Sequence, residues 1–318
     1  MQKPLVAILC ITYNQEKFII KCLEGIVGQI ADFPFVAIVH DDASTDKTQE
    51  IISDYAKRYP NIILPYFETE NQYRKGDGSL RRITNEAMFN TGAKYYATCE
   101  GDDYWTDPYK LQKQFDALEA HPECTFSCGL VQTCNIDGEF YTTTIPDKSV
   151  LIPNILSMED YMKSEFEKGL WTFQLSSFMM KKEVLESYSK LKETLFKNIP
   201  YADIPLFLTA LLQGKGYYIN ESLSVYRRMS GGFTSNIENN RELRIKFANN
   251  IINDFRNFNK WTEFKYNRFI KFKILREKFK IAYLSKNYFQ IFNPIFIPLY
   301  KVDGLRKTLS SIKNCFFK

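Results

Sequence analysis

Short apolar runs alternate with segments of helical spacing through the first 120 residues. Leu5–Ile11 is continuously apolar, as expected for a strand buried on both faces of a parallel sheet. The next segment, Lys17–Gln29, repeats apolar residues at helical spacing and predicts a helix. The pattern further predicts strands at Phe35–Val39, Asn61–Phe67 and Tyr95–Cys99. It predicts one helix that ends at Tyr59 and two more at Ile83–Asn90 and Leu111–Ala120, with a loop at Glu68–Arg82.

Strands that alternate with helices in this way predict a wound parallel sheet. Ligands of such sheets bind outside the carboxyl ends of the strands. Two of these ends carry paired acids, Asp41-Asp42 and Asp102-Asp103. The sequence therefore predicts a ligand site at this edge of the sheet.

The remaining chain has a less regular pattern and no internal repeat. It predicts a strand-rich stretch over Thr125–Thr144, strands at Phe173–Met180 and Gly216–Ile219, a helix from Glu183, a helix over Ile204–Leu212 opened by Asp203, and helices from Arg241 onward.

Charge is distributed unevenly along a chain of ordinary globular composition, 45% hydrophobic and 25% charged, with net charge +5. Residues 256–318 hold fifteen Lys or Arg and three acids, a local charge of +12, which leaves −7 for the preceding residues. This split indicates a basic tail on a mildly acidic body, and basic tails bind nucleic acid or anionic lipid.

The cysteines and the apolar runs indicate the compartment. Seven cysteines without paired clustering argue against the disulfide framework of a small secreted protein. Residues 1–9 carry one basic side chain and lead directly into a strand, so we expect no signal peptide. The run nearest to a membrane span, Ile281–Tyr300, is interrupted by Lys286 and two prolines. A cytoplasmic location is expected.

Asp102-Asp103 is the strongest candidate for a metal site. Two adjacent carboxylates behind a glycine offer hard oxygen ligands, which Mg²⁺ and Mn²⁺ prefer. The alternative for any aspartate pair is a solvated turn or a helix cap. The position of this pair at a strand end, followed by Tyr104-Trp105, favours the metal site.

Asp41-Asp42 is the second acidic pair. An acid at this strand end commonly binds a ribose hydroxyl or a base N–H in nucleotide-binding α/β folds. Helix capping by Asp42 or Ser44 is the alternative, and Ser44 or Thr45 is expected to cap the helix that follows.

Three segments together resemble family 2 glycosyltransferases: Ile11–Asn14 after the first strand, His40–Asp46 after the second and Cys99–Trp105 after the fourth. The resemblance covers roughly residues 3–120, weakens through the middle and ends after about residue 240. It implies the GT-A fold, a nucleotide-binding α/β domain, and inverting transfer of a sugar from a nucleoside diphosphate.

Site residues follow from that resemblance motif by motif. Asp103 would be the direct ligand of Mn²⁺ or Mg²⁺, and Asp102 would contact the ribose and the metal-bound water. Asp42 would bind the uracil or ribose end, and Tyr13 would border the base. Contacts with the nucleotide sugar are expected from Ile11, Thr12, Tyr13, Asp42, Arg81, Arg82 and Asp102. For the two arginines, solvation is the alternative.

An inverting transferase also needs a general base. The family places a carboxylate for this at the start of a helix beyond the second apolar strand, where this chain has Asp203. The alternative for Asp203 is a helix cap, since Ile204-Pro205 follows it. Glu183 and Glu221 are weaker candidates. The histidines are poorly placed, and His40 is interpreted as structural.

Other motifs narrow the interpretation. The segment Arg227–Gly232 could close over the donor, with glycine as the hinge. His121, Cys124, Cys128 and Cys134 lack zinc-site spacing and are interpreted as core residues. The chain has no Gly-x-Gly-x-x-Gly or phosphate loop, and it lacks the Gln-x-x-Arg-Trp element of processive family members, which predicts addition of one sugar per encounter.

Basic and aromatic residues alternate through residues 264–273. This mixture is what an interfacial helix presents to an anionic membrane. A solvated helix face and nucleic-acid binding are the alternatives, although no motif supports nucleic acid. A lipid-linked acceptor would give membrane contact a purpose.

The sequence thus predicts an α/β protein of GT-A fold with a mainly helical, basic C-terminal extension. Residues 1–240 would form the transferase domain, with the nucleotide bound by residues 1–120 and the acceptor by residues 121–240, and residues 241–318 would form the extension. The expected donor is a UDP-sugar, and the expected acceptor is a glycan or lipid-linked molecule in cell-surface polysaccharide synthesis. The protein would lie in the cytoplasm or on the inner face of the cell membrane.

Two rival functions remain. A sugar-1-phosphate nucleotidyltransferase would be expected to carry a Gly-rich, basic phosphate loop after the first strand, where this chain has Ile11–Asn14. A non-catalytic nucleotide-sugar-binding protein would not need the intact Asp102, Asp103 and Asp203.

Overall fold

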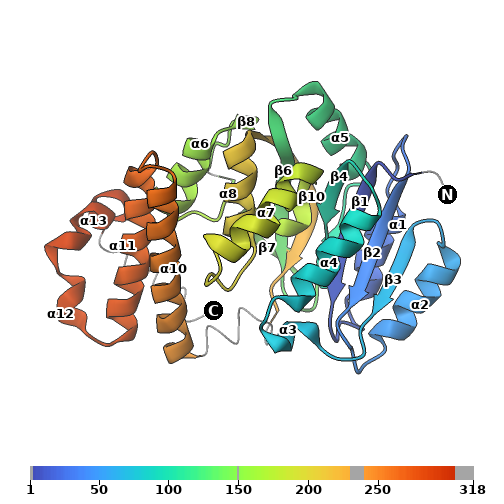
Figure 1. The fold of residues 1–318 in the computed structure, drawn as a ribbon, viewed down its shortest axis with the longest axis horizontal. Helices are drawn as coiled ribbons and strands as arrows, with labels where there is room; N and C mark the ends of the chain where they lie inside the picture. The colour runs from blue at the N-terminus through green and yellow to red at the C-terminus, as the bar shows by residue number, and fades with distance from the viewer. Residues whose placement is uncertain (1–2, 149, 230–239, 305–318) are drawn as a thin grey trace. The chain divides into compact units, whose positions relative to one another are not determined.

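The computed structural model describes residues 3–148, 150–229 and 240–304 (Figure 1). The chain forms two compact units, each assembled from separate stretches of sequence. The first unit comprises Met1–Leu156, Phe173–Ser189 and Thr209–Arg228, and the second comprises Ser157–Thr172, Lys190–Leu208 and Met229–Lys318. The functional division at residue 240 stays a prediction.

The first unit is built on a sheet of ten strands within the described residues, with the order β3-β2-β1-β4-β9-β6-β10-β5 and with β7 and β8 beside β6 and β10. The strands are β1 (Val6–Thr12), β2 (Phe35–Asp41), β3 (Ile63–Phe67), β4 (Tyr95–Thr98), β5 (Tyr104–Trp105), β6 (Cys124–Cys134), β7 (Phe140–Ile145), β8 (Ile155–Leu156), β9 (Met179–Lys181) and β10 (Lys215–Arg227).

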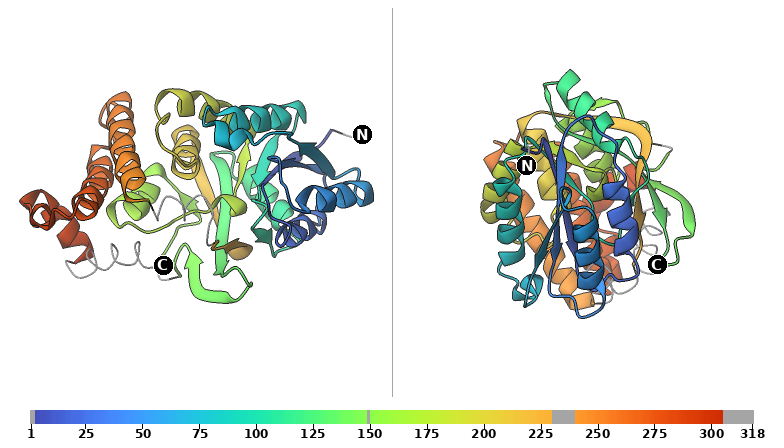
Figure 2. Two further views of the ribbon diagram at one scale, coloured as in Figure 1. Left: turned by 90° about the horizontal axis from the view of Figure 1, so that it is seen from below. Right: turned by 90° about the vertical axis from the view of Figure 1, so that its right-hand side faces the viewer.

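The predicted parallel sheet is confirmed for the first four strands, because β1 pairs in parallel with both β2 and β4, and β2 with β3. The antiparallel strand β9 separates this part from the parallel pair β6–β10. The connecting helices α1 (Ile19–Val27) and α2 (Thr48–Arg58) cover one face of this parallel part and α4 (Ser79–Asn90) covers the other (Figure 2), as expected when the strand order reverses after β3.

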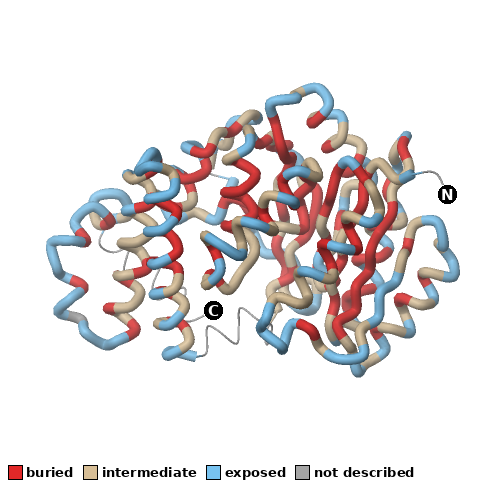
Figure 3. The backbone as a smooth tube through the Cα atoms, viewed as in Figure 1, coloured by how far each residue is buried: buried red, intermediate tan, exposed pale blue. Residues whose placement is uncertain are grey.

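The centre of the sheet is the most buried part of the first unit, as the red trace of β1, β2 and β4 in Figure 3 shows. The apolar run of β1 packs there against α1, whose inward residues Ile19, Cys22, Leu23 and Ile26 are all buried. Burial on both faces explains why β1 is continuously apolar instead of alternating.

Three local predictions were wrong. The stretch 68–82 is not all loop, because Asn71 caps a short helix, α3 (Gln72–Lys75), and α4 begins at Ser79. Helix α2 starts at Thr48 and is not capped by Ser44 or Thr45, since the Ser44 hydroxyl accepts a hydrogen bond from the Asn14 backbone N–H (2.8 Å).

The third wrong prediction is the strand over 173–180. Only Met179–Lys181 pairs as β9, and Leu175–Ser177 forms a 3₁₀ turn. The polar side chains of this stretch turn inward, because they bind a buried carboxylate described below.

The second unit is mainly helical and confirms the predicted helical C-terminal region. Its helices include α6 (Met158–Met162), the π-helical turn η1 (Lys163–Glu167), α10 (Arg241–Trp261), α11 (Asn267–Leu284), α12 (Tyr288–Ile291), the 3₁₀ turn η3 (Pro294–Phe296) and α13 (Ile297–Asp303). Helices α5 (Lys110–Ala120), α7 (Lys182–Thr194) and α8 (Asp203–Gln213) complete the chain, and the last two contribute residues to both units.

Aromatic packing holds the second unit together. Phe166 of η1 meets Phe255 of α10 edge-on at a centroid distance of 5.1 Å, and Phe196 packs on Phe258 at 5.3 Å. Asp254 is buried and accepts hydrogen bonds from the backbone N–H groups of Asn198 and Ile199. No helix among the described residues combines the length and apolar character needed to cross a membrane.

Candidate active site

Residues 100–103, here called the acidic turn, leave the carboxyl end of β4 beside the end of β1. The Gly101 N–H donates to the Ile11 carbonyl (3.0 Å), which ties the turn to β1. A Cβ at Gly101 would lie 2.3 Å from Gln15 Oε1 and 2.9 Å from Thr12 Cβ. Only glycine therefore allows the turn to approach β1 this closely.

Asp103 is fully engaged within the protein. Its side chain is buried, with 1% of the residue exposed. One carboxylate oxygen accepts from the Arg227 backbone N–H (2.9 Å), and the other accepts from Gln174 Nε2 (2.9 Å) and Ser176 Oγ (2.6 Å). These three bonds join the acidic turn to the 3₁₀ turn and to the end of β10.

Asp102 is placed differently. It is half-buried, and in the described part of the chain its carboxylate takes no hydrogen bond from another residue. Glu100 is exposed, and its backbone N–H donates to Ser176 Oγ (3.2 Å). The predicted pair of ligands thus contains one aspartate held by the protein and one available to a ligand.

Carboxylate oxygens of Glu100, Asp102 and Asp103 lie within 4.8 Å of one another. This is the only such group of acidic, histidine or cysteine ligands within the described residues. Hard oxygen donors on a partly open turn fit Mg²⁺ or Mn²⁺ better than a soft metal. Glu100 was not among the residues predicted from sequence, although its position two residues before Asp102 is a recognisable signal.

Burial sets the electrostatics of this turn. It raises the pKa of Asp103 well above the usual range, and the nearby charge of Asp102 raises that pKa further. Burial also raises the pKa of Asp102, while the positive charge of Arg227 opposes the rise. Crowded, partly desolvated carboxylates gain from a cation that neutralises their charge.

Arg227 opens the segment predicted to close over the donor, but its contacts with the acidic turn were not predicted from sequence. Its Nε donates to the backbone carbonyl of Asp102 (3.0 Å), and its guanidinium carbon lies 4.8 Å from the ring centroid of Phe18 and 5.6 Å from that of Tyr104. With its backbone N–H on Asp103, Arg227 binds both aspartates of the turn. Only the pairing of β10 across the sheet brings it there, so no local motif could show it.

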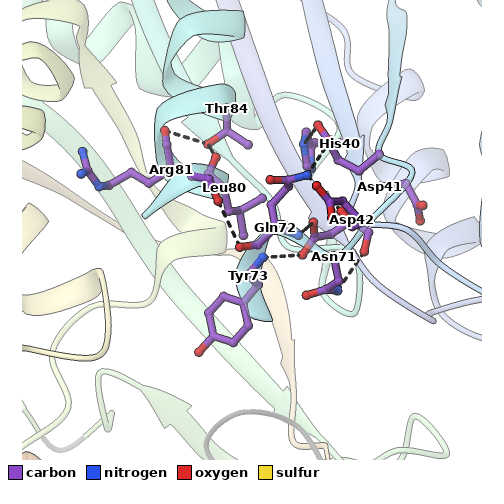
Figure 4. A network of polar contacts seen from close by, with 12 residues as sticks. His40, Asp41, Asp42, Asn71, Gln72, Tyr73, Leu80, Arg81 and Thr84 are labelled. Atoms are coloured by element: carbon purple, nitrogen blue, oxygen red, sulfur yellow. Dashed lines mark hydrogen bonds and ion pairs between the residues drawn. The ribbon is translucent and has the colours of Figure 1, made fainter. Parts of the chain in front are cut away.

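The second acidic pair lies in a network of internal hydrogen bonds (Figure 4). Asp42 is 2% exposed, and its carboxylate accepts from the backbone N–H groups of Gln72 (2.7 Å) and Tyr73 (3.0 Å). Asp41 accepts from the Ser44 N–H (2.9 Å) and from Gln49 Nε2 (2.6 Å). The capping alternative applies to Asp42, but the helix it caps is α3 and not α2.

The loop after β1 contains the remaining residues of the first motif. Thr12 is buried at the end of β1 and pairs with Asp41, Ile11 lies beside it, and Tyr13 is half-buried. The Arg74 guanidinium lies 5.5 Å from the Tyr13 ring centroid. Asn14 has a left-handed φ of 52° and accepts the Thr45 N–H (2.7 Å), which joins the loops after β1 and β2.

Arg81 and Arg82 lie in the first turn of α4. Figure 4 shows the Arg81 guanidinium pointing away from Asp42. Arg82 Nη1 donates to the Asp77 carbonyl (2.7 Å), and its side chain is about half exposed. Their contact with phosphate stays a prediction.

Asp203 begins α8 and belongs to the second unit. Burial raises its pKa to about 6. In the same unit, Glu165 accepts the Thr172 N–H (3.0 Å), and burial raises the pKa of Glu165 to about 7. A carboxyl group of this kind is able to take up a proton near neutral pH.

The remaining candidates are structural or lie elsewhere. His40 is buried and its Nε2 lies 3.1 Å from Glu68 Oε1, as expected of a structural histidine. Cys124, Cys128 and Cys134 are buried in β6, which supports their interpretation as core residues. The part of the predicted closing segment from 230 onward lies outside the described residues.

The sequence of residues 7–189 matches the family described as Glycosyl transferase family 2. A protein of Mycobacterium tuberculosis without an assigned function is 30% identical over 71% of this chain, and the chain spans 60% of that relative's length. The putative teichuronic acid biosynthesis glycosyltransferase TuaG of Bacillus subtilis is 28% identical over 74% of this chain and 83% of its own.

Two solved structures have a similar fold. TarS residues 1–349 of S. aureus in complex with UDP-GlcNAc has a TM-score of 0.56 and 15% identity, and the alignment covers 98% of this chain and 81% of TarS. The mannosyltransferase PcManGT of Pyrobaculum calidifontis, in complex with GDP-Man and Mn²⁺, has a TM-score of 0.51 and 14% identity over 100% of this chain and 88% of its own. The GT-A fold is therefore confirmed.

Proposed function

The chain belongs to glycosyl transferase family 2, and we propose that it transfers one sugar from a nucleoside-diphosphate sugar to a hydroxyl group with inversion at the anomeric carbon. The observation that carries this proposal is the acidic turn, which gathers three carboxylates at the carboxyl end of β4 and beside the end of β1. Ligands of open α/β sheets bind at this edge.

Within the turn, the two aspartates have separate roles. Asp102 and Glu100 would hold Mn²⁺ or Mg²⁺, while Asp103 uses its hydrogen bonds to hold the turn against Gln174, Ser176 and the end of β10. This assignment reverses the order predicted from sequence, because Asp103 is buried and already accepts three hydrogen bonds. When bound, the cation would neutralise the charge that develops on the departing diphosphate. The Mn²⁺ in PcManGT supports a cation in this fold.

The nucleotide would lie along the loops after β1 and β2. Tyr13 offers a half-buried ring for the base, and Arg74 beside it offers a positive charge. Asp42 would act indirectly by fixing the backbone at Gln72 and Tyr73, since both of its oxygens accept N–H groups. A UDP-sugar is the proposed donor, in keeping with the UDP-GlcNAc of TarS.

Asp203 is the proposed general base. It would accept the proton of the attacking hydroxyl, and a pKa near 6 leaves it mostly ionised yet basic at neutral pH. The acceptor would be a glycan or lipid-linked molecule of the cell surface. The relationship to TuaG, which is named for teichuronic acid biosynthesis, supports this context.

The test is donor turnover. Purified protein would be offered UDP-, GDP- and dTDP-sugars with Mn²⁺, with Mg²⁺ or with chelator, and the released nucleoside diphosphate would be measured. We expect release from one donor class that needs the cation and increases when a lipid-linked acceptor is added. Release of pyrophosphate from a sugar 1-phosphate and nucleoside triphosphate would instead identify a nucleotidyltransferase. Binding of donor without turnover of any kind would contradict the enzymatic proposal.

A further inference from the structure

The end of the second unit exposes an unusual amount of apolar surface. Large apolar side chains point to solvent from α12, from η3 and α13, and from the turn between α12 and η3, where the trace in Figure 3 is mostly pale blue. Their exposed fractions are 95% for Phe289, 68% for Phe292, 45% for Ile295, 47% for Ile297 and 39% for Val302. We call these five residues the apolar tip. Exposed apolar side chains gathered within so short a stretch are typical of a binding surface.

The apolar tip belongs to a folded segment that has a hydrophobic core of its own. The same stretch already buries Ile291, Phe296 and Leu299 in a small core with Phe279 of α11. Phe296 and Phe279 pack edge-on with their centroids 5.1 Å apart. The exposed residues are therefore those left outside a formed core, on a supported scaffold.

The stretch of chain that carries the apolar tip is rich in basic residues. Residues 267–304 contain eight Lys or Arg and two acids. Both acids are paired internally: Glu277 lies 3.2 Å from Lys273 Nζ and 3.5 Å from Lys280 Nζ, and Asp303 lies 2.7 Å from an Arg276 nitrogen. Lys286, which precedes the apolar tip in sequence, and Lys301, which lies next to Val302 within it, are exposed and have no ion-pair partner among the described residues.

We propose that the apolar tip inserts into the interface of an anionic lipid bilayer, with Lys286 and Lys301 binding the lipid headgroups. The apolar side chains would enter the boundary of the acyl chains, and the unpaired lysines beside them would bind the negative headgroups. A second copy of the chain fits less well, because two segments of like positive charge would repel. Nucleic acid fits the lysines, and its bases are able to stack on phenyl rings, but it has no apolar layer to accept the aliphatic side chains of Ile295, Ile297 and Val302. The proposal is independent of the transfer reaction.

The experiment is flotation of the full-length protein with vesicles. One set would contain phosphatidylcholine alone, and the other would contain phosphatidylcholine with phosphatidylglycerol as the anionic component. We expect binding to the anionic vesicles that weakens as salt is added, because screening removes the lysine contribution. Phe289→Ser with Phe292→Ser should lower the partition coefficient about tenfold or more, since two apolar side chains no longer insert.

Two further variants separate the contributions. Lys286→Gln with Lys301→Gln should lower binding to anionic vesicles about thirtyfold, at roughly 1 kcal/mol per lysine, and leave any binding to neutral vesicles unchanged. The matched control is Phe140→Ser, which removes a phenylalanine of similar exposure (57%) from β7 of the first unit and should bind like the wild type. Circular dichroism and thermal unfolding would verify that every variant is folded.

The outcomes are distinguishable. Absence of wild-type binding to anionic vesicles, or equal binding by the folded Phe289→Ser/Phe292→Ser variant, would overturn the proposal. A concentration-dependent dimer that this variant abolishes would assign the surface to a second copy instead. Binding to an oligonucleotide in preference to vesicles would assign it to nucleic acid. Since flotation requires no turnover, a failed transferase assay would not affect this result, nor would failed flotation affect the assay.

Discussion

The division of roles between Asp102 and Asp103 is best tested by replacing each carboxylate with its amide. Asp103→Asn keeps the shape of the side chain but replaces one acceptor oxygen with an N–H₂ donor. If the remaining oxygen stays with Gln174 and Ser176, the new donor faces the Arg227 backbone N–H, which lies 2.9 Å from the present oxygen. One charged hydrogen bond is lost and two donors oppose each other.

The magnitude follows from the number of bonds affected. Loss of a hydrogen bond to a charged acceptor costs about 1.5–3 kcal/mol, and a buried unsatisfied donor adds to that cost. Removal of the buried charge offsets part of the loss, because burial raises the pKa of Asp103 and so opposes its ionised form. We expect Asp103→Asn to lower the free energy of unfolding by about 2 kcal/mol, which corresponds to roughly 4–8 °C in the melting temperature.

Asp102→Asn should behave in the opposite way. Its carboxylate takes no hydrogen bond from another described residue, so the melting temperature without metal should stay within about 1 °C of the wild type. Stabilisation by added Mn²⁺, measured as a melting-temperature shift, should be lost in Asp102→Asn and retained in Asp103→Asn. A stable Asp103→Asn variant that has lost the Mn²⁺ shift, beside an Asp102→Asn variant that retains it, would refute the assignment and restore the order predicted from sequence.

Three other predictions follow from the structure. Because the pKa of Asp203 is raised to about 6, kcat/KM of the wild type should fall as the pH decreases through about 6. Asp203→Asn should be slower by about 10²–10⁴-fold and should lack this pH dependence, while a titration should show that it still binds donor. An unchanged rate would show that Asp203 is not the base. Burial lowers the pKa of Lys110 from 10.5 to about 7, so folding disfavours its protonated form and the associated cost grows as pH decreases from about 10 to about 7. The unfolding free energy of Lys110→Met minus that of the wild type should therefore increase by up to about 1.4 kcal/mol for each pH unit by which the pH is lowered from about 10 to about 7. A difference in urea unfolding that does not depend on pH would contradict this. Gly101→Ala should destabilise the protein by about 1–3 kcal/mol and weaken the Mn²⁺ shift, because its Cβ would meet Gln15 and Thr12, whereas Gly76→Ala, with nothing within 4 Å but a left-handed φ of 67°, should change stability without affecting Mn²⁺. A normal Mn²⁺ shift in Gly101→Ala would show that the close approach to β1 is not needed for the site.

Much of the first unit was predictable because its signals are local. The apolar run of β1 predicts a buried strand, and the spacing of apolar residues in α1 predicts a helix with one buried face. The acids at the ends of β2 and β4 mark where those strands end. The parallel sheet then follows from the order of these elements. The acidic turn could be found from sequence for the same reason. Its residues are consecutive, and the strand end places them at the edge where ligands bind.

Only the tertiary structure gives the two aspartates of this turn different surroundings. Asp102 and Asp103 are chemically identical neighbours, and only the contacts of Asp103 with Gln174 and Ser176 of a distant 3₁₀ turn and with Arg227 of β10 distinguish the buried residue from the half-buried one. The same contacts turn residues 175–177 out of the strand that their apolar neighbours predict. Hydrogen bonds between segments more than seventy residues apart leave no periodic pattern in a sequence, so the difference in burial between the two aspartates becomes apparent only in the folded sheet.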